Sequence, residues 1–339
     1  MIAKKDTILI TGVAGLLGWN FANYLLKETK HKVIGIDALE SWGNNNIIEP
    51  QKNYKFYHIY LGEPDPLHKL DQIMEENDVK CVYHFASYAA EGLSPFMRHF
   101  NYIQNTLATA QVINTCIKHD CKLIYTSSMA VYGHGVDMQK PFDENDQPSP
   151  IDPYGIAKYG CELDIKVAGE QHGMDWVIIR PHNVFGIGQN VNDRYRNVIG
   201  IWMHQSFARE PITIYGDGNQ ERAFTYIDNI LEPLYQSLNL SKEIINLGGK
   251  EGITINKACE IVSYVTSWFN VQHLEPRHEV KHAIPNPQKS IDLFDYKDVV
   301  TFEEGVRKMW SWVINNDKVS EWYEWNNFEL DKGIYNYWK

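Results

Sequence analysis

Short runs of apolar, β-branched residues recur along most of the chain and alternate with longer stretches that carry a helical pattern. Each run is apolar at nearly every position, which is typical of strands in a parallel sheet that helices cover on both faces. The pattern therefore predicts an α/β fold with a doubly wound parallel sheet. The predicted strands cover residues 7–11, 32–37, 55–60, 80–86, 122–128, 175–181 and 244–249.

The pattern changes after residue 182. Residues 183–205 are rich in Asn, Arg and Gly, and helical segments such as "TINKACEIVSYVTSW" occupy the chain beyond residue 250. Because 339 residues exceed the usual size of one domain, we expect two parts with a cleft between them. The first is a dinucleotide-binding sheet domain over residues 1–182, and the second is a smaller C-terminal α/β substrate lobe over residues 183–339. Strand-like segments within residues 223–249 are compatible with a return to the first sheet.

Composition narrows the classes of function. The formal net charge of −11 argues against a nucleic-acid-binding protein, which needs a clustered basic surface. No apolar run reaches membrane-spanning length, and the N-terminus lacks the features of a signal peptide. The cysteines form no C-x-x-C pair, so we expect reduced thiols, no metal site and a cytoplasmic location. They are Cys81, Cys116, Cys121, Cys161 and Cys259.

A glycine-rich turn follows the first predicted strand. "ILITGVAGLLGWNFANYLLKE" places Gly12, Gly15 and Gly18 between a strand and an amphipathic helix, where backbone amides and the helix N-terminus favour a pyrophosphate. The alternative is a strand-to-helix turn that only packs closely. Asp37 ends the second strand nineteen residues after Gly18, where a carboxylate binds an adenosine ribose and repels a 2'-phosphate. The two features together predict NAD rather than NADP.

A serine, a tyrosine and a lysine indicate proton-transfer chemistry. Ser127 and Ser128 end the fifth predicted strand, at the sheet edge where open α/β folds bind ligands. Tyr154 and Lys158 are one helical turn apart in "DPYGIAKYGCELD", so they share a helix face. A nearby cation stabilises the phenolate and lowers the pKa of the phenol, which would make Tyr154 a base. The alternative is chance, because the chain has 20 tyrosines.

Seven motifs together resemble the extended short-chain dehydrogenase/reductase superfamily, and within it the NAD-dependent sugar-nucleotide epimerase/dehydratase family. They span almost the whole chain in the order of that family. The resemblance implies a Rossmann-type sheet, NAD as the cofactor, a nucleotide-sugar substrate and a homodimer. The motifs are "TGVAGLLG", "VYHFAS", "YTSSMAVYG", "PYGIAKYGCE", "IIRPHNVFG", "IYGDGNQERAFTYIDN" and "RHEVKHA".

The resemblance also implies a role for individual residues. Tyr154 would accept and donate the proton, Lys158 would hold the nicotinamide ribose, and Ser128 would bind the reacting sugar oxygen. The other cofactor-binding residues would be Gly12, Gly15, Leu16, Leu17, Gly18, Asp37, Phe85, Ala86, Ser87, Asn105, Ser127, Pro181 and His182. The substrate would contact Ser128, Tyr154, Asn183, Asn197, Tyr215, Arg222 and Arg277, since a diphosphate needs guanidinium partners and an aromatic ring can cover a uracil.

The subclasses of this family differ in the residues at the end of the fifth strand. Its 4,6-dehydratases resemble "TDEVYG" there, whereas this chain has Met129 and Ala130 in place of the carboxylates that eliminate water. The hypothesis that fits best is a UDP-hexose 4-epimerase, and Asn183 is more similar to enzymes of neutral hexoses than of glucuronate. The alternatives are an NAD-dependent reductase, dehydratase or other epimerase of a nucleotide sugar, and a dinucleotide-sensing protein without turnover.

Some segments depart from the family. At the end of the third predicted strand the family often has an Asp-Ile or Asp-Leu pair that touches adenine, whereas this chain has Tyr60 and Leu61 or a shifted register, so the adenine contact is left unassigned. Ala89 replaces a lysine seen in well-known galactose epimerases. The segments "SYAAEGLSP" and "NDRYRNVIG" are therefore expected to alter substrate choice. Arg194 and Arg196 in the second segment could meet an anionic sugar or a phosphate. The nucleotide, the sugar and its N-acetylation stay open at this point.

Overall fold

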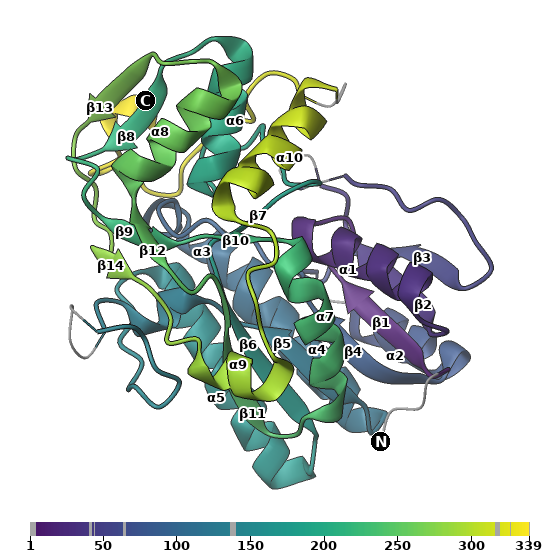
Figure 1. The fold of residues 1–339 in the computed structure, drawn as a ribbon. Helices are drawn as coiled ribbons and strands as arrows, with labels where there is room; N and C mark the ends of the chain where they lie inside the picture. Colours follow the sequence, from purple (N-terminus) through teal and green to yellow (C-terminus); the bar gives the residue numbers. More distant parts are fainter. Residues whose placement is uncertain are drawn as a thin grey trace.

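The computed structural model describes residues 5–40, 43, 45–63, 66–135, 140–315, 319–325 and 327–338. Its centre is a seven-stranded sheet in which all neighbouring strands run parallel (Figure 1). In spatial order, the strands are β11 (Glu243–Gly248), β6 (Trp176–His182), β5 (Lys122–Thr126), β4 (Val79–His84), β1 (Thr7–Thr11), β2 (Lys32–Asp37) and β3 (Tyr54–His58).

Helices cover both faces of this sheet, which confirms the predicted α/β fold with a doubly wound sheet. One face carries α1 (Leu16–Glu28) and α7 (Asp228–Gln236), which contact each other. The other face carries α2 (Pro66–Asn77), α4 (Ala108–Lys118) and α5 (Pro153–His172), and their apolar residues form a second core with the sheet. The inner strands are buried on both sides, which explains their nearly continuous apolar sequence.

The order of the strands creates a crevice in the middle of the sheet. From β1 the chain adds β2 and β3 in one direction, then returns to place β4, β5 and β6 on the other side. At such a reversal the loops after neighbouring strands diverge, and ligands bind at the carboxyl ends of the strands. The loops after β1, β4 and β5 all open onto this crevice.

The smaller lobe lies above the carboxyl edge of the main sheet in Figure 1. Its helices are α6 (Val198–Ala208), α8 (Ile255–Thr266) and α10 (Phe302–Ile314), which pack on one another. Short strands pair around them, namely β8 (Ile212–Tyr215) with β13 (Val271–Leu274), and β9 (Glu221–Ala223) with β12 (Gly252–Thr254) and β14 (His282–Ala283). α9 (Gln288–Phe294) contacts α7 and β11.

The chain crosses between the two parts more than once. β7 (Val184–Phe185) pairs with β10 (Thr225–Tyr226) at the junction, so the segment "AFTYID" does not join the main sheet. The later segment "IINLGG" does join it, because β11 pairs with β6. No helix of the described ranges is long and apolar enough to cross a bilayer.

The last described residues pack against the loop that follows β4. We call this group the C-terminal aromatic cluster, and it joins the segment before α3 (Arg98–Tyr102) to residues beyond 324. Glu329 fastens the contact because its carboxylate accepts hydrogen bonds from the first two amides of α3 that follow Arg98, at 2.7 and 2.8 Å. The cluster contains Tyr88, Ala90, Leu93, Phe96, Met97, Phe100, Tyr195, Trp325, Phe328, Ile334, Tyr335, Tyr337 and Trp338.

Candidate active site

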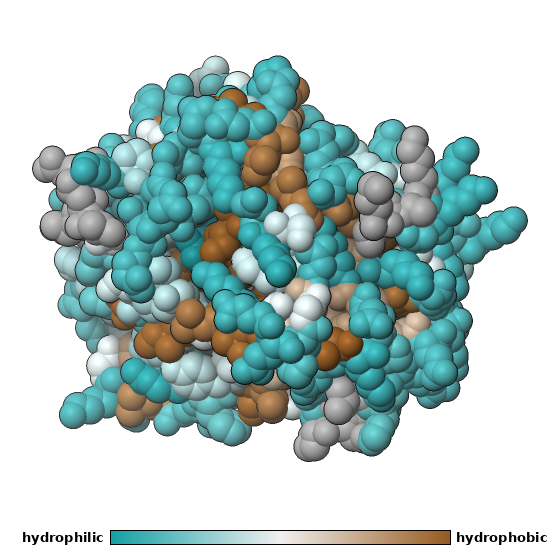
Figure 2. Space-filling model, turned by 90° about the horizontal axis from the view of Figure 1, so that it is seen from below, coloured by the Kyte–Doolittle hydropathy of each residue, from teal (hydrophilic) through white to brown (hydrophobic). Residues whose placement is uncertain are grey.

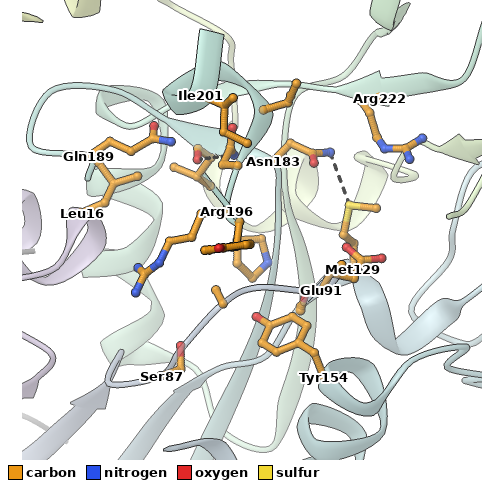
Figure 3. Close-up of a pocket in the computed structure, with 18 of the residues that line it drawn as sticks. Leu16, Ser87, Glu91, Met129, Tyr154, Asn183, Gln189, Arg196, Ile201 and Arg222 are labelled. Carbon is orange, nitrogen blue, oxygen red and sulfur yellow. Dashed lines mark hydrogen bonds between the residues drawn. The ribbon is translucent and has the colours of Figure 1, made fainter. Parts of the chain in front are cut away.

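A cavity of about 340 Å³ lies at the carboxyl edge of the main sheet and extends into the smaller lobe. It brings together residues from both halves of the chain, as Figure 3 shows for a part of the lining. The predicted site residues that line it are Gly12, Gly15, Leu16, Leu17, Gly18, Phe85, Ser87, Ser127, Ser128, Tyr154, Lys158, Pro181, Asn183, Asn197, Tyr215, Arg222 and Arg277. Asp37, Ala86, Asn105 and His182 do not line it.

The glycine-rich turn needs its glycines because the backbone is crowded there. Gly12 has a φ of +69°, and a Cβ on it would lie 2.6 Å from the amide nitrogen of Ala86. A Cβ on Gly18 would lie 2.2 Å from the carbonyl oxygen of Gly12. Gly15 precedes α1 and offers no side chain to cap it. The first amides of α1 are therefore left for a ligand, and the helix dipole favours an anion there.

Asp37 fixes the same turn from the end of β2. Its carboxylate accepts hydrogen bonds from the amides of Ala14 and Leu39, both at 2.9 Å. Burial raises the pKa of Asp37, and these backbone hydrogen bonds oppose the increase. Asp37 thus holds the turn while it places a carboxylate beside the start of α1.

Tyr154 and Lys158 enter the cavity from the first turns of α5. The helix starts at Asp152, whose carboxylate accepts a hydrogen bond from the amide of Gly155 at 2.9 Å. The ammonium of Lys158 donates to the carbonyl oxygen of Thr126 at 2.8 Å and lies 5.8 Å from the centre of the Tyr154 ring. Burial lowers the pKa of Lys158 to about 8.

The pKa of Tyr154 differs from the expectation that the lysine lowers it. Burial raises the pKa of this phenol, and a hydrogen bond with Ser128 is the strongest effect in the opposite direction. Lys158 does not offset the effect of burial, because its ammonium lies over the ring and donates to a carbonyl oxygen instead of the phenol. Ser128 accepts a hydrogen bond from the amide of Ala130 at 3.1 Å, which fixes its hydroxyl at the end of β5.

Ser127 points away from this chemistry. Its hydroxyl donates to Glu162 on α5 at 2.5 Å, and Glu162 forms a fully buried bidentate pair with Arg180 of β6, at 2.9 and 2.6 Å. Arg180 also donates to the hydroxyl of Tyr132 at 2.7 Å, which in turn donates to Asn246 of β11 at 2.8 Å. The sequence analysis did not assign this network. A charged residue inside the apolar run "WVIIRP" was the available signal, because a buried charge needs a partner.

His182 and Asn105 lie behind the cavity wall. His182 is completely buried, and burial lowers its pKa to about 3, so the imidazole is neutral near pH 7. Asn105 sits in a π-helical turn over Ile103–Leu107 and donates to the carbonyl and side-chain oxygens of Asn101, both at 3.0 Å. Asn101 donates to the carbonyl oxygen of Pro153 at 3.0 Å. Asn105 therefore supports the start of the helix that carries Tyr154.

The far end of the cavity holds two arginines and an aromatic ring. Arg222 and Arg277 share the carboxylate of Glu279 at 3.0 and 3.4 Å, and Arg277 lies over the Tyr215 ring at 4.6 Å. Asn197 lines this end but uses its side chain as the N-cap of α6, because its oxygen accepts from the amide of Ile199 at 3.0 Å. This end offers positive charge and a flat aromatic surface, which suit a nucleoside diphosphate.

Residues 8–248 match the model of the NAD dependent epimerase/dehydratase family. The chain belongs to this family. It is 29% identical to a putative UDP-glucose 4-epimerase of Methanocaldococcus jannaschii, over 92% of this chain and 99% of that one. It is 30% identical to a UDP-glucuronate 4-epimerase of Thermodesulfobacterium geofontis, over 91% of this chain and 96% of that one.

Solved structures of this family agree with the fold. The UDP-glucose 4-epimerase of Thermotoga maritima, with UDP-glucose, has a TM-score of 0.83 at 25% identity and covers 91% of this chain and 99% of its own. The UDP-N-acetylglucosamine 4-epimerase of Methanobrevibacter ruminantium, with UDP-N-acetylmuramic acid, has a TM-score of 0.82 at 30% identity and covers 92% and 99%. The protein is thus an NAD-dependent enzyme of nucleotide-sugar chemistry.

The residues at the glycine-rich turn fit the cofactor of the family. The uncapped start of α1 suits a pyrophosphate, and Asp37 places an acceptor where a ribose hydroxyl would lie. Lys158 and Tyr154 line the same cavity and would face the nicotinamide end. A bound NAD⁺ supplies a hydride acceptor and a positive ring, and that charge would favour the Tyr154 phenolate.

Arg194 and Arg196, whose roles the sequence did not decide, lie in different surroundings in the structure. Arg196 lines the cavity and pairs with the fully buried carboxylate of Asp193 at 2.8 Å (Figure 3). Asp193 also accepts a hydrogen bond from Tyr88 at 3.0 Å. Arg194 turns away and pairs with Glu324 at 2.5 Å, beside the C-terminal aromatic cluster. Of the two, Arg196 is therefore the one placed to meet a ligand.

Glu91 is a lining residue that the sequence analysis did not assign. It belongs to "SYAAEGLSP", the segment after β4 that was expected to alter substrate choice, and it lies next to Tyr154 and Met129 in Figure 3. No local pattern distinguishes it from a solvated glutamate. Its position depends on the path of the whole loop, which distant residues determine.

Proposed function

We propose that the protein is an NAD-dependent 4-epimerase of a nucleotide-diphosphate hexose, with UDP-glucose and UDP-galactose or their N-acetyl forms as substrates. The main observation in support is that Ser128, Tyr154 and Lys158 line one cavity. The adjacent residues Met129 and Ala130 offer no carboxylate. Such a site supports proton exchange at a sugar hydroxyl. It lacks the acid and base at the end of β5 that an elimination of water would use.

The residues would divide the work as follows. Arg222 and Arg277 would hold the diphosphate, and Tyr215 would cover the base. Tyr154, as phenolate, would take the proton from the C4 hydroxyl of the sugar, with Ser128 bound to the same oxygen. Loss of this proton and of the hydride on C4, which bound NAD⁺ would accept, would leave a 4-keto sugar.

Inversion then requires the other face of the 4-keto sugar. The intermediate would rotate about its link to the diphosphate, which stays bound by the arginines. Tyr154 would return the proton to the oxygen at C4 as the hydride comes back. Because the cofactor is regenerated in each cycle, NADH does not accumulate during turnover.

Proton NMR of the purified, NAD-loaded enzyme tests the proposal. UDP-glucose, UDP-galactose and the two UDP-N-acetylhexosamines are incubated separately, and we expect each active substrate to give its C4 epimer at constant NADH. Loss of water with formation of a 6-deoxy-4-keto sugar would support a dehydratase instead. Stoichiometric formation or consumption of NADH would support a dehydrogenase or reductase. Complete absence of hydrogen exchange at C4 would favour a dinucleotide sensor.

We also propose that two copies of the chain form a dimer through α4 and α5. The outer side of these packed helices, together with the π-helical turn before α4, exposes large apolar side chains, among them Leu107, Ile156, Leu163 and Val167, each 44–47% exposed. Figure 2 views the molecule from below, the side toward which α5 extends in Figure 1, and shows hydrophobic side chains that interrupt a hydrophilic surface. Exposed apolar surface of this kind is typical of an interface.

A further inference from the structure

The carboxylate of Glu91 lies in the cavity without a partner from the protein. Among the described residues, no hydrogen bond or ion pair to its side chain is formed, although its carbonyl oxygen accepts from Ser94 at 2.8 Å. Burial raises the pKa of this carboxyl group. Glu91 is only partly exposed, so its carboxylate has lost part of its water on folding without gaining a hydrogen bond from the protein, and a bound ligand can supply that hydrogen bond.

The backbone holds Glu91 firmly at this place. The amide of Ser94 donates to the carbonyl oxygen of Ala90 at 3.0 Å, and the hydroxyl of Ser94 accepts a hydrogen bond from the amide of Tyr154 at 3.1 Å. The loop that carries Glu91 is therefore joined to the start of α5. A Cβ on the next residue, Gly92, would lie 3.4 Å from both Arg277 and Trp338, so the loop also touches the far end of the cavity.

These contacts place Glu91 beside the sugar of the proposed substrate. Tyr154 must reach the reacting hydroxyl, and Arg277 lies at the diphosphate end of the same cavity. The sugar connects these two points, and Glu91 lies in the loop that contacts both of them. In Figure 3 it is drawn next to Met129 and above Tyr154.

The cations that line the cavity form no ion pair with Glu91. Arg222 and Arg277 lower its pKa through their charge, but both pair with Glu279, and Arg196 pairs with Asp193. A second carboxylate, that of Asp152, lies nearby, and burial together with the charge of Glu91 raises the pKa of Asp152 to about 7. The part of the cavity next to Tyr154 is therefore rich in acceptors and negative charge.

We propose that Glu91 determines which sugar the enzyme accepts, by accepting hydrogen bonds from hydroxyl groups of an uncharged hexose and by repelling the carboxylate of a hexuronate. The inference rests on the proposed function and specifies the sugar class of the same site. A hydroxyl bound to a carboxylate makes a strong, charge-assisted hydrogen bond. A C6 carboxylate would instead lie beside Glu91 in a poorly solvated cavity, where like charges repel strongly.

Calorimetric titration of the NAD-loaded enzyme tests this directly. UDP-glucose and UDP-glucuronate are titrated into the wild type, into Glu91→Gln, which keeps the shape of the side chain, and into Glu75→Gln. Glu75 is an exposed residue of α2 and serves as the matched control. We expect the wild type to bind UDP-glucose at least about tenfold more tightly than UDP-glucuronate. Glu91→Gln should reduce this ratio to about threefold or less, and Glu75→Gln should leave it unchanged.

The inference and the proposed function fail in different ways. An unchanged ratio in Glu91→Gln, with an unaltered melting temperature, would overturn the inference even if UDP-glucose is epimerised. Tighter binding of UDP-glucuronate than of UDP-glucose by the wild type would also overturn it. Retention of the expected ratio without any inversion at C4 would leave the sugar selectivity intact and contradict the epimerase proposal alone.

Discussion

At the scale of single residues, Ser127 and Ser128 line the same cavity but have different hydrogen-bond partners. Ser128 is fixed at the end of β5 near Tyr154, whereas Ser127 is bound to Glu162. One peptide unit thus separates a residue that can meet substrate from one that stabilises the fold. Because the buried network is bound by Ser127 and not by Tyr154, a substitution of Tyr154 tests its function without disturbing that network.

Tyr154→Phe should lower kcat by about 10²–10⁴-fold, because the variant keeps the ring and loses the group that exchanges the proton. Binding of the nucleotide sugar should change by less than about threefold, since Arg222 and Arg277 are untouched. Steady-state kinetics and calorimetric titration measure the two effects. Tyr264→Phe, at a ring that is 65% exposed on α8, is the control. A Tyr154→Phe enzyme with a kcat near that of the wild type would refute the assignment.

His182 should make the fold sensitive to acid. Its pKa is about 3 in the folded protein and about 6.5 when unfolded, so the unfolded state takes up the proton first as the pH falls below 6.5. Stability is therefore lost between pH 6.5 and 3. Denaturant unfolding at pH 7 and pH 4.5 should show that His182→Phe loses about 2 kcal/mol less over this interval than the wild type.

The matched control for this measurement is His172→Gln, at an exposed position near the end of α5. It should keep the acid sensitivity of the wild type. Equal losses in His182→Phe and in the wild type would show that His182 is not the group that titrates. Comparing the pH dependence, and not the stability at one pH, removes the general effect of a changed core residue.

Residue types and their spacing predicted those parts of the candidate site that depend on neighbours in sequence, but not those that depend on distant segments. The glycine-rich turn and the Tyr154–Lys158 pair depend on neighbours in sequence, and the cavity brings them together. Glu91 depends on a loop that a distant C-terminal segment supports, so no local pattern could identify it. The pKa of Tyr154 was expected to fall, but desolvation by the surrounding fold, which spacing cannot measure, raises it.

At the scale of elements, Glu162 and Arg180 join α5 to β6 under the site. The pair is almost inaccessible, and its hydrogen bonds extend to Ser127, Tyr132 and β11 through Asn246. This network fixes the helix that carries Tyr154 relative to the sheet. Removing one partner of such a buried pair destabilises the fold much more than replacing both, because the remaining charge is left buried without a partner.

Glu162→Gln and Arg180→Met should each lower the free energy of unfolding by about 3–5 kcal/mol, because each leaves a buried polar or charged group without its partner. The double variant Glu162→Met/Arg180→Met should be more stable than the sum of the two single effects predicts. Denaturant unfolding of the four proteins forms the double-mutant cycle. Additive effects would show that the two side chains do not act as a pair.

Apolar patterning predicted the strands of the main sheet well, since each inner strand is buried on both faces. It was less informative at the junction with the smaller lobe. The segment "AFTYID" has the composition of a sheet strand, but its residues pair in short strands with β7 and β12. Composition indicates that a segment is buried and extended. The strand with which the segment pairs depends instead on the path of the whole chain.

At the scale of the whole molecule, the exposed apolar side of α4 and α5 predicts that two copies of the chain form a dimer. Leu163→Arg places a charge in the proposed interface, where burying it would be costly. Sedimentation velocity should show a dimer for the wild type and a species near the single-chain mass of 39.3 kDa for the variant. Leu293→Arg on α9, at a side chain that is 38% exposed, should remain a dimer. A monomeric wild type would contradict the proposed dimer.

The C-terminal aromatic cluster has a consequence for the order in which the protein is made. Chains fold from the N-terminal side during synthesis, so the strands up to β6 can pair while later residues are still being added. The loop that carries Glu91 packs against Trp325, Phe328 and Trp338, which are synthesised after every strand of the main sheet. A nascent chain would therefore have its glycine-rich turn in place well before its sugar pocket is closed. The proposed selectivity of Glu91 would therefore arise only after these aromatic residues have been synthesised.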